Sequence, residues 1–160
     1  MQEENQSSSY QTELEKNGVI AFVPSGNSMW PTLKNHKQSV FVKKKEQKLK
    51  KYDVALYMRN GGTYVLHRVM MPTDYGYIIC GDSQFSLEKV KEEQVFGVMT
   101  EFYKGKKLIS VDDEKYKRKV ENWYKHKKIR KIRLKLFYIR VKIKSILHRI
   151  FCGKTKTDKE

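Results

Sequence analysis

The spacing of hydrophobic positions divides the chain into a body with the period of β-strands and a tail with the period of a helix. Short β-branched and aromatic runs between turn residues predict strands, because such side chains pack well on a pleated, half-buried surface. The predicted strands cover residues 18–24, 39–43, 52–58, 63–69, 75–80, 94–103 and 107–111. Many short strands with little helix between them predict a mainly β body.

Two of these runs form a predicted hairpin. The runs 52–58 and 63–69 are separated by residues 59–62, which read Arg-Asn-Gly-Gly. Asn-Gly favours a tight hairpin turn, because both central positions of that turn want a positive φ. The second strand of the hairpin carries His67 near its end. The lysine-rich segment 43–51, which precedes the hairpin, is expected to be a solvated loop.

An apolar series with steps of three and four residues runs through the tail. Such steps place all members on one face of a helix. The series consists of Ile129, Ile132, Leu136, Ile139, Ile143, Ile146 and Ile150. Lysines and arginines occupy the other faces, so the pattern predicts a basic amphipathic helix. The alternation at 132, 134 and 136 would fit a strand, but the series runs for about six turns and favours the helix.

These patterns predict four segments in the 160 residues. Residues 1–16 are polar and are expected to be a flexible N-terminus or a frayed helix. Residues 17–112 form the predicted β domain. The basic amphipathic helical tail covers residues 113–152, and a disordered C-terminus covers residues 153–160.

The positive charge of the chain is concentrated in its tail. The net charge is +16, but residues 1–114 contain 16 Lys and Arg against 15 Asp and Glu, whereas residues 115–160 contain 18 against 3. This asymmetry indicates an anionic partner. We favour an anionic membrane surface, bound through residues 115–152, because phosphate contact alone needs no seam of isoleucine and leucine. Nucleic acid is the less favoured partner, and docking on a protein or on the body is a third option.

The sequence shows no signal peptide and no run of about 18–20 apolar residues that would span a membrane. The expected location is therefore the cytoplasm or the cytoplasmic face of the membrane. The two cysteines, Cys80 and Cys152, do not indicate a disulfide framework, and no metal-ligand spacing occurs. We expect no cofactor and no metal.

Three short strings in the body contain the residue types of a serine hydrolase. The first reads Ser-Gly-Asn-Ser-Met-Trp-Pro-Thr-Leu over residues 25–33. The second reads Tyr-Val-Leu-His-Arg-Val over residues 64–69, and the third reads Gly-Asp-Ser over residues 81–83. In this order they supply a hydroxyl, a base and a carboxylate.

Each of these groups has a chemical role that depends on the others. A serine hydroxyl such as that of Ser28 is a weak nucleophile until a base takes its proton. His67 can be that base, because the unperturbed pKa of histidine lies near neutrality. A carboxylate would hold the histidine tautomer and stabilise the imidazolium. Asp82 is the first candidate for this role and Glu88 is the second.

The three strings resemble the conserved boxes of the superfamily that joins type I signal peptidases with LexA-type self-cleaving repressors. The resemblance covers roughly residues 18–110 and implies the family's coiled β-sheet domain. It implies that Ser28 is the nucleophile and that Asp82 is the aspartate of the third box. His67 stands where the common bacterial enzymes have lysine and where the endoplasmic-reticulum and archaeal enzymes have histidine. The chain is therefore similar to the Ser-His variant.

The resemblance implies a serine endopeptidase that cleaves a precursor, leader or signal-type peptide after small residues. A membrane-bound exporter is a further candidate partner of such an enzyme. Two alternatives from other classes stay open. The chain can be a catalytically inactive binding module at a membrane surface, or a nucleic-acid-binding protein that acts through its basic tail.

Overall fold

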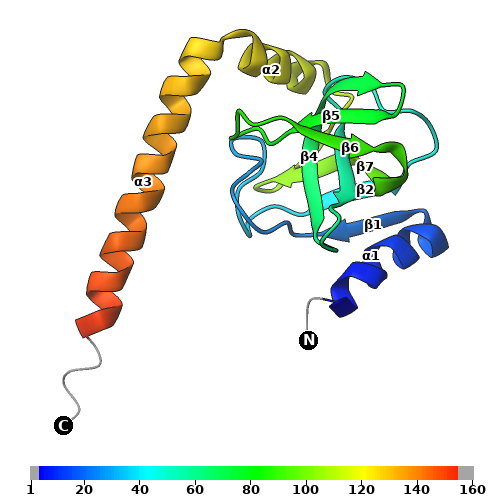
Figure 1. Cartoon of the computed structure of the whole chain (residues 1–160). Coiled ribbons are helices and arrows are strands. Elements are labelled where there is room, and N and C mark those ends of the chain that lie inside the picture. The colour runs from blue at the N-terminus through cyan, green and yellow to red at the C-terminus, as the bar shows by residue number, and fades with distance from the viewer. Residues whose placement is uncertain (1–3, 155–160) are drawn as a thin grey trace. The chain divides into compact units, whose positions relative to one another are not determined.

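The computed structural model describes residues 4–154 of the chain. The described residues form two units that divide between Arg118 and Lys119. The first unit is built on an antiparallel sheet of eight strands (Figure 1). The mainly β class expected from the sequence is therefore present.

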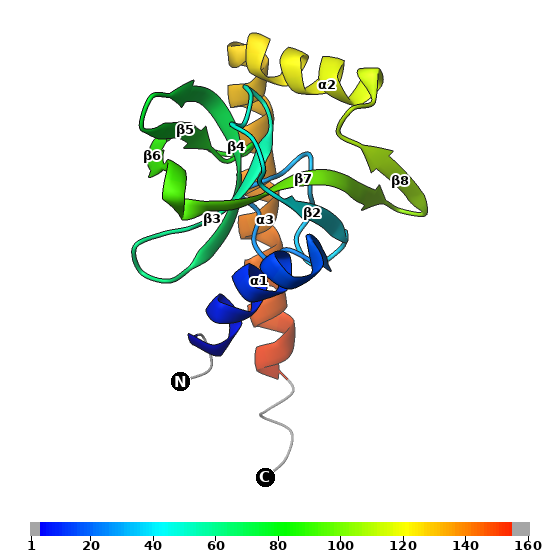
Figure 2. The ribbon, with the colours of Figure 1, turned by 90° about the vertical axis from the view of Figure 1, so that its right-hand side faces the viewer.

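The strands follow the order β1-β2-β7-β3-β4-β5-β6 across the sheet, and β8 pairs with β7 outside this path. Figure 2 shows the sheet as a curved layer. Their bounds are β1 (Val19–Phe22), β2 (Val40–Lys44), β3 (Val54–Met58), β4 (Tyr64–Thr73), β5 (Gly76–Cys80), β6 (Glu88–Lys91), β7 (Val95–Lys104) and β8 (Lys107–Ser110). All seven predicted strands are present, including the hairpin of β3 and β4, which pairs Ala55 with His67. The sequence analysis missed β6, because its charged residues flank one buried side chain, Val90.

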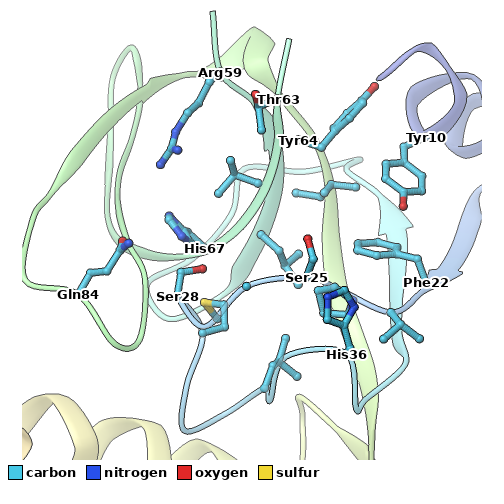
Figure 3. Close-up of a pocket in the computed structure, with 18 of the residues that line it drawn as sticks. Tyr10, Phe22, Ser25, Ser28, His36, Arg59, Thr63, Tyr64, His67 and Gln84 are labelled. Carbon is cyan, nitrogen blue, oxygen red and sulfur yellow. The ribbon is translucent and has the colours of Figure 1, made fainter. Parts of the chain in front are cut away.

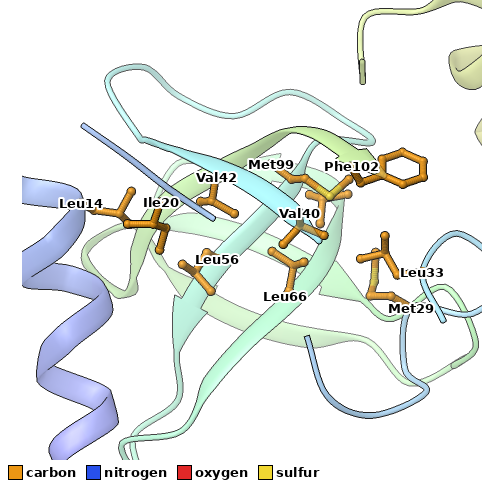
Figure 4. Close-up of a cluster of buried hydrophobic side chains, with 11 residues drawn as sticks. Leu14, Ile20, Met29, Leu33, Val40, Val42, Leu56, Leu66, Met99 and Phe102 are labelled. Carbon is orange, nitrogen blue, oxygen red and sulfur yellow. The ribbon is translucent and has the colours of Figure 1, made fainter. Parts of the chain in front are cut away.

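The hydrophobic core fixes the loop that carries Ser28. One cluster of buried side chains joins residues of α1 (Glu4–Asn17), the sheet and this loop (Figure 4). Its members from the loop are Met29 and Leu33, which are 5% and 3% exposed. The labelled members are Leu14, Ile20, Met29, Leu33, Val40, Val42, Leu56, Leu66, Met99 and Phe102. Ser28 therefore stands beside a buried anchor rather than on a free loop.

The N-terminal segment forms the helix α1, and a helix was one of the two structures expected for it. Leu14 of α1 is only 1% exposed and belongs to the core cluster. The helix ends at Asn17, and the N–H of Gly18 donates to the carbonyl oxygen of Leu14 at 2.9 Å. Gly18 has a φ of 72°, the left-handed conformation that glycine adopts after a helix. Tyr10 of the same helix also packs against this cluster, so α1 docks through both side chains.

The basic tail consists of two helices, α2 (Glu114–Lys125) and α3 (Lys127–Lys154). The Asp113 carboxylate accepts from the N–H of Tyr116 at 2.9 Å and so caps the start of α2. The segment that could have been a strand is helical, as the length of the apolar series predicted. Disorder was predicted for residues 153–160. Of these, residues 153 and 154 belong to α3, and residues 155–160 lie outside the described part of the chain. Within residues 4–154, no helix has the length and apolar content that crossing a membrane requires.

Candidate active site

The Gly-Asp-Ser string holds the backbone of the loop that carries Ser28. The N–H of Ser83 donates to the carbonyl oxygen of Ser28 at 2.8 Å, and the hydroxyl of Ser83 donates to the carbonyl oxygen of Asn27 at 2.9 Å. A Cβ at Gly81 would lie 2.7 Å from the Ser28 carbonyl oxygen, so this approach requires glycine. The first and third strings are therefore in direct contact.

Asp82 forms a buried ion pair with Arg68 of β4. Its two carboxylate oxygens accept from Nε and Nη2 of Arg68, both at 2.7 Å, and the two side chains are 1% and 0% exposed. The hydroxyl of Thr32 also donates to Asp82. Arg68 further donates to the carbonyl oxygen of Tyr52 at 2.8 Å. Asp82 thus joins the Ser28 loop to β4. The sequence analysis had instead expected the Asp82 carboxylate to contact His67.

His67 lies in β4, is 3% exposed, and meets a tyrosine instead of a carboxylate. Its Nδ1 lies 3.2 Å from the hydroxyl oxygen of Tyr57 on β3. The same hydroxyl donates to Oε2 of Glu88 on β6 at 2.9 Å. The phenol has one proton and the carboxylate only accepts, so the Tyr57 oxygen must accept from Nδ1–H of His67. This assigns the tautomer with a free lone pair on Nε2, which a general base requires.

Glu88 is kept ionised by Arg59. The guanidinium group binds the carboxylate through two hydrogen bonds, Nε to Oε1 at 2.8 Å and Nη2 to Oε2 at 2.7 Å. These bonds lower the pKa of Glu88, and the bond from Tyr57 adds to the effect. Arg59, Glu88, Tyr57 and His67 therefore form one continuous hydrogen-bonded chain, which we call the His67 relay.

Burial sets the protonation states within the His67 relay. It lowers the pKa of His67 to about 4, and the positive charge of Arg59 acts in the same direction. The carboxylates of Glu88 and Asp82 oppose this shift without cancelling it. Burial also raises the pKa of the Tyr57 phenol, as does its hydrogen bond to Glu88. At neutral pH the imidazole is neutral and the phenol keeps its proton.

We expect NMR titration of the His67 ring to give a pKa near 4. The folded-state pKa lies below the value of about 6.5 for an unfolded chain, so the folded protein binds fewer protons between these two values. His67 therefore makes folding less favourable as the pH falls from about 6.5 toward 4. A His67 midpoint at or above 6.5 would contradict the burial argument.

Ser28 and His67 line the same cleft, which has a volume of about 810 Å³. Figure 3 shows the imidazole of His67 next to the side chain of Ser28, with Arg59 and Gln84 on the same part of the wall. Asp82 is not part of the cleft lining and is buried in its ion pair with Arg68. The two residues predicted as nucleophile and base are thus together in one cleft.

The sequence analysis missed Tyr57 and Arg59, although the predicted hairpin contained a signal for Tyr57. Ala55 pairs with His67, and a residue two positions along a strand faces the same side. Tyr57 could therefore have been placed near His67. Arg59 binds Glu88, which lies on β6. Because β6 was not predicted, the role of Arg59 could not be inferred from the sequence.

Within the part of the chain that the structure describes, no three His, Cys, Asp or Glu side chains gather in a way that could hold a metal ion. No protein-family model and no curated protein matches the chain. The resemblance to the signal peptidase superfamily accordingly rests on the three short strings.

Proposed function

We propose that the chain is a serine endopeptidase in which Ser28 is the nucleophile and His67 is the general base. The observation that carries this proposal is the buried imidazole whose Nδ1 is held by Tyr57 in the cleft that also contains Ser28. In the tautomer assigned above, Nε2 carries the lone pair that a general base needs, and Ser28 lines the same cleft. The same arrangement argues against a catalytically inactive module.

The reaction follows from the proton positions. Ser28 Oγ attacks the carbonyl carbon of the scissile peptide bond, and His67 Nε2 takes the hydroxyl proton. The backbone N–H of Ser28 is the donor that we assign to the oxyanion. His67 then gives the proton to the leaving amine, which breaks the C–N bond and leaves an ester on Ser28. Water then attacks the ester carbonyl carbon while His67 Nε2 takes one of its protons. The bond between this carbon and Ser28 Oγ breaks, His67 returns the proton to Oγ, and the carboxylic acid product leaves.

The His67 relay serves the charged intermediate of this reaction. When Nε2 is protonated, the imidazolium keeps its Nδ1–H bond to Tyr57, whose own proton points to ionised Glu88. The negative charge of Glu88 thereby stabilises the positive charge that forms on the ring. Glu88 takes the supporting role through Tyr57, and Asp82 positions the Ser28 loop.

An open strand edge next to the catalytic pair supports a peptide substrate. β4 pairs with β3 over Tyr64–Arg68 but with β5 only from Arg68 onward. In the described residues, Tyr64–His67 therefore pair along one edge only, and all four line the cleft. An unpaired edge accepts an extended chain through backbone hydrogen bonds. The substrate proposed here is an extended segment of a precursor, leader or signal-type peptide.

The proposal is tested by incubating the chain with a mixture of unstructured peptides and identifying new peptide ends by mass spectrometry. We expect defined cleavage by the native chain and none by the Ser28→Ala variant. Ser86→Ala is the matched control, because Ser86 is exposed and lies outside the cleft lining. Equal cleavage by the native chain and Ser28→Ala would contradict the proposal.

We also propose that α3 lies on an anionic membrane surface, where a membrane-bound exporter could be met. The seam residues Ile129, Ile132, Leu136, Ile139, Ile143 and Ile146 are each 45–60% exposed. The side chain of Ile150 lies outside the described part of the chain. The α3 sequence contains seven lysines, four arginines and no acidic residue. Each such cation near an anionic leaflet contributes about 1 kcal/mol, and the apolar seam favours lipid over nucleic acid.

Vesicle co-sedimentation separates the seam from the charge. We expect binding to vesicles with anionic phosphatidylglycerol and little binding to neutral phosphatidylcholine vesicles. Ile139→Glu with Ile143→Glu should lower binding at least tenfold more than Val141→Glu with Ser145→Glu, which adds the same charge on another helix face. Equal losses in the two pairs, or salt-sensitive binding to DNA or RNA without vesicle binding, would contradict the membrane proposal.

A further inference from the structure

The cleft that contains Ser28 and His67 extends to three aromatic side chains. Tyr10 of α1, Phe22 of β1 and Tyr64 of β4 all belong to its lining. Figure 3 shows these three rings grouped at the opposite side of the view from His67. We call this group the aromatic corner. Segments that are far apart in the sequence build it, and α1 contributes one of its walls.

The rings of the aromatic corner are held in place by each other and by α1. Tyr10 stacks on Phe22 with ring centroids 4.9 Å apart and an interplanar angle of 30°. Tyr10 meets Tyr64 edge to face at 5.3 Å. The N–H of Gln11 donates to the hydroxyl of Tyr64 at 3.3 Å, which ties α1 to β4. The corner is therefore a preformed surface that binding does not have to order.

All three rings are half-buried, so each keeps part of its surface open to the cleft. Apolar surface of this kind gains free energy when a ligand removes it from water. Burial also raises the pKa of the Tyr10 and Tyr64 phenols, so both stay uncharged at neutral pH. The open surface therefore fits an apolar group better than an anion.

The position of the corner relates it to the catalytic pair. Tyr64 and His67 stand at the two ends of the open edge of β4, three residues apart. A strand rises about 3.3 Å per residue, so a peptide on this edge spans about three residues between them. The peptide residue nearest His67 is next to the scissile bond. The peptide residue about three positions away places its side chain at the aromatic corner.

We infer that the aromatic corner is a subsite for a bulky apolar side chain, aromatic or branched aliphatic, located about three residues from the scissile bond of the peptide substrate. This inference rests on the proposed peptidase function. It makes α1 a part of the substrate site, with Tyr10 as a residue that determines specificity.

The experiment compares peptides that carry Phe, Leu, Ala or Lys at each position within four residues of the bond that the native chain cleaves. We expect one position about three residues away at which Phe and Leu raise kcat/KM at least tenfold over Ala and Lys. Tyr10→Ala and Phe22→Ala should each reduce this preference severalfold more than they reduce kcat/KM for the Ala peptide. Tyr75→Ala is the control, because Tyr75 is 88% exposed and outside the cleft lining.

A binding measurement separates this inference from the proposed function. The Ser28→Ala variant should bind the Phe peptide at least fivefold more tightly than the Ala peptide, and adding Tyr10→Ala or Phe22→Ala should abolish this difference. That result supports the subsite even if no cleavage occurs. The inference is overturned if no position shows the preference, or if both aromatic variants weaken all peptides equally. Two variants from different elements guard against a simple loss of α1 docking.

Discussion

Replacement of His67 by alanine is expected to lower kcat/KM for peptide cleavage by about 10⁴-fold or more. In the proposed mechanism the imidazole takes the proton of Ser28, and removing the base of such a pair removes most of the catalysis. His67→Gln is the second variant, because glutamine fills more of the buried site and leaves a smaller cavity. Urea unfolding of both variants shows whether the fold is retained. Cleavage within tenfold of the native rate in either folded variant would contradict the role of His67.

Variants of the other residues in the His67 relay should lower kcat/KM by smaller amounts. Tyr57→Phe should lower kcat/KM by less than His67→Ala, by about 10–100-fold, because the ring keeps its place but Nδ1–H loses its acceptor. Adding Glu88→Gln to Tyr57→Phe should lower the rate little further, since Glu88 reaches His67 through the Tyr57 hydroxyl. Independent, multiplicative losses from the two changes would show that the two side chains act separately.

The second large effect is expected on stability. Asp82→Ala should lower the free energy of unfolding by about 3–5 kcal/mol, because it leaves the fully buried guanidinium of Arg68 without its carboxylate. Combining Asp82→Ala with Arg68→Met should recover part of this loss, since the uncompensated charge is then removed. Chemical denaturation of the native chain and the two variants measures both numbers.

A second variant, Asp82→Asn, tests what Asp82 does. Under the assignment of Asp82 to the Ser28 loop, Asp82→Asn should destabilise the fold, and any loss of cleavage should accompany that loss of stability. Suppose instead that Asp82→Asn left stability unchanged but abolished cleavage. Asp82 would then be the direct partner of the base, and the relay through Tyr57 would be secondary.

The limits of the sequence prediction are visible at His67 and Arg68. Neighbouring residues on a strand face opposite sides of the sheet. Asp82 pairs with Arg68, so it approaches the other side of β4 from the one that His67 occupies. The sequence analysis chose Asp82 because it stands next to glycine in a recognisable string. Arg68, which follows His67, was a second possible partner for Asp82. Because side chains alternate along a strand, Asp82 can reach only one of these two residues.

The elements of the fold that have a local sequence pattern were predictable. Those that depend on a few contacts between distant residues were less so. Alternation and turn residues located seven strands and the hairpin that delivers His67. The docking of α1 uses Leu14 and Tyr10, two side chains in a polar segment, and β6 buries one side chain, Val90. Glu88 and Tyr57 come together only because β6 and β3 are both in place. Such contacts between distant segments have no local sequence period, so the relay required the three-dimensional structure.

Ser28 is the proposed nucleophile, and His67 is proposed to activate it. The most direct measurement treats the native chain and the His67→Gln variant with a fluorophosphonate probe, and locates the adduct by peptide mapping. We expect a single adduct on Ser28 of the native chain at neutral pH, and its rate of formation should fall at least a hundredfold in His67→Gln. No adduct on Ser28, or the same rate in both proteins, would contradict the account.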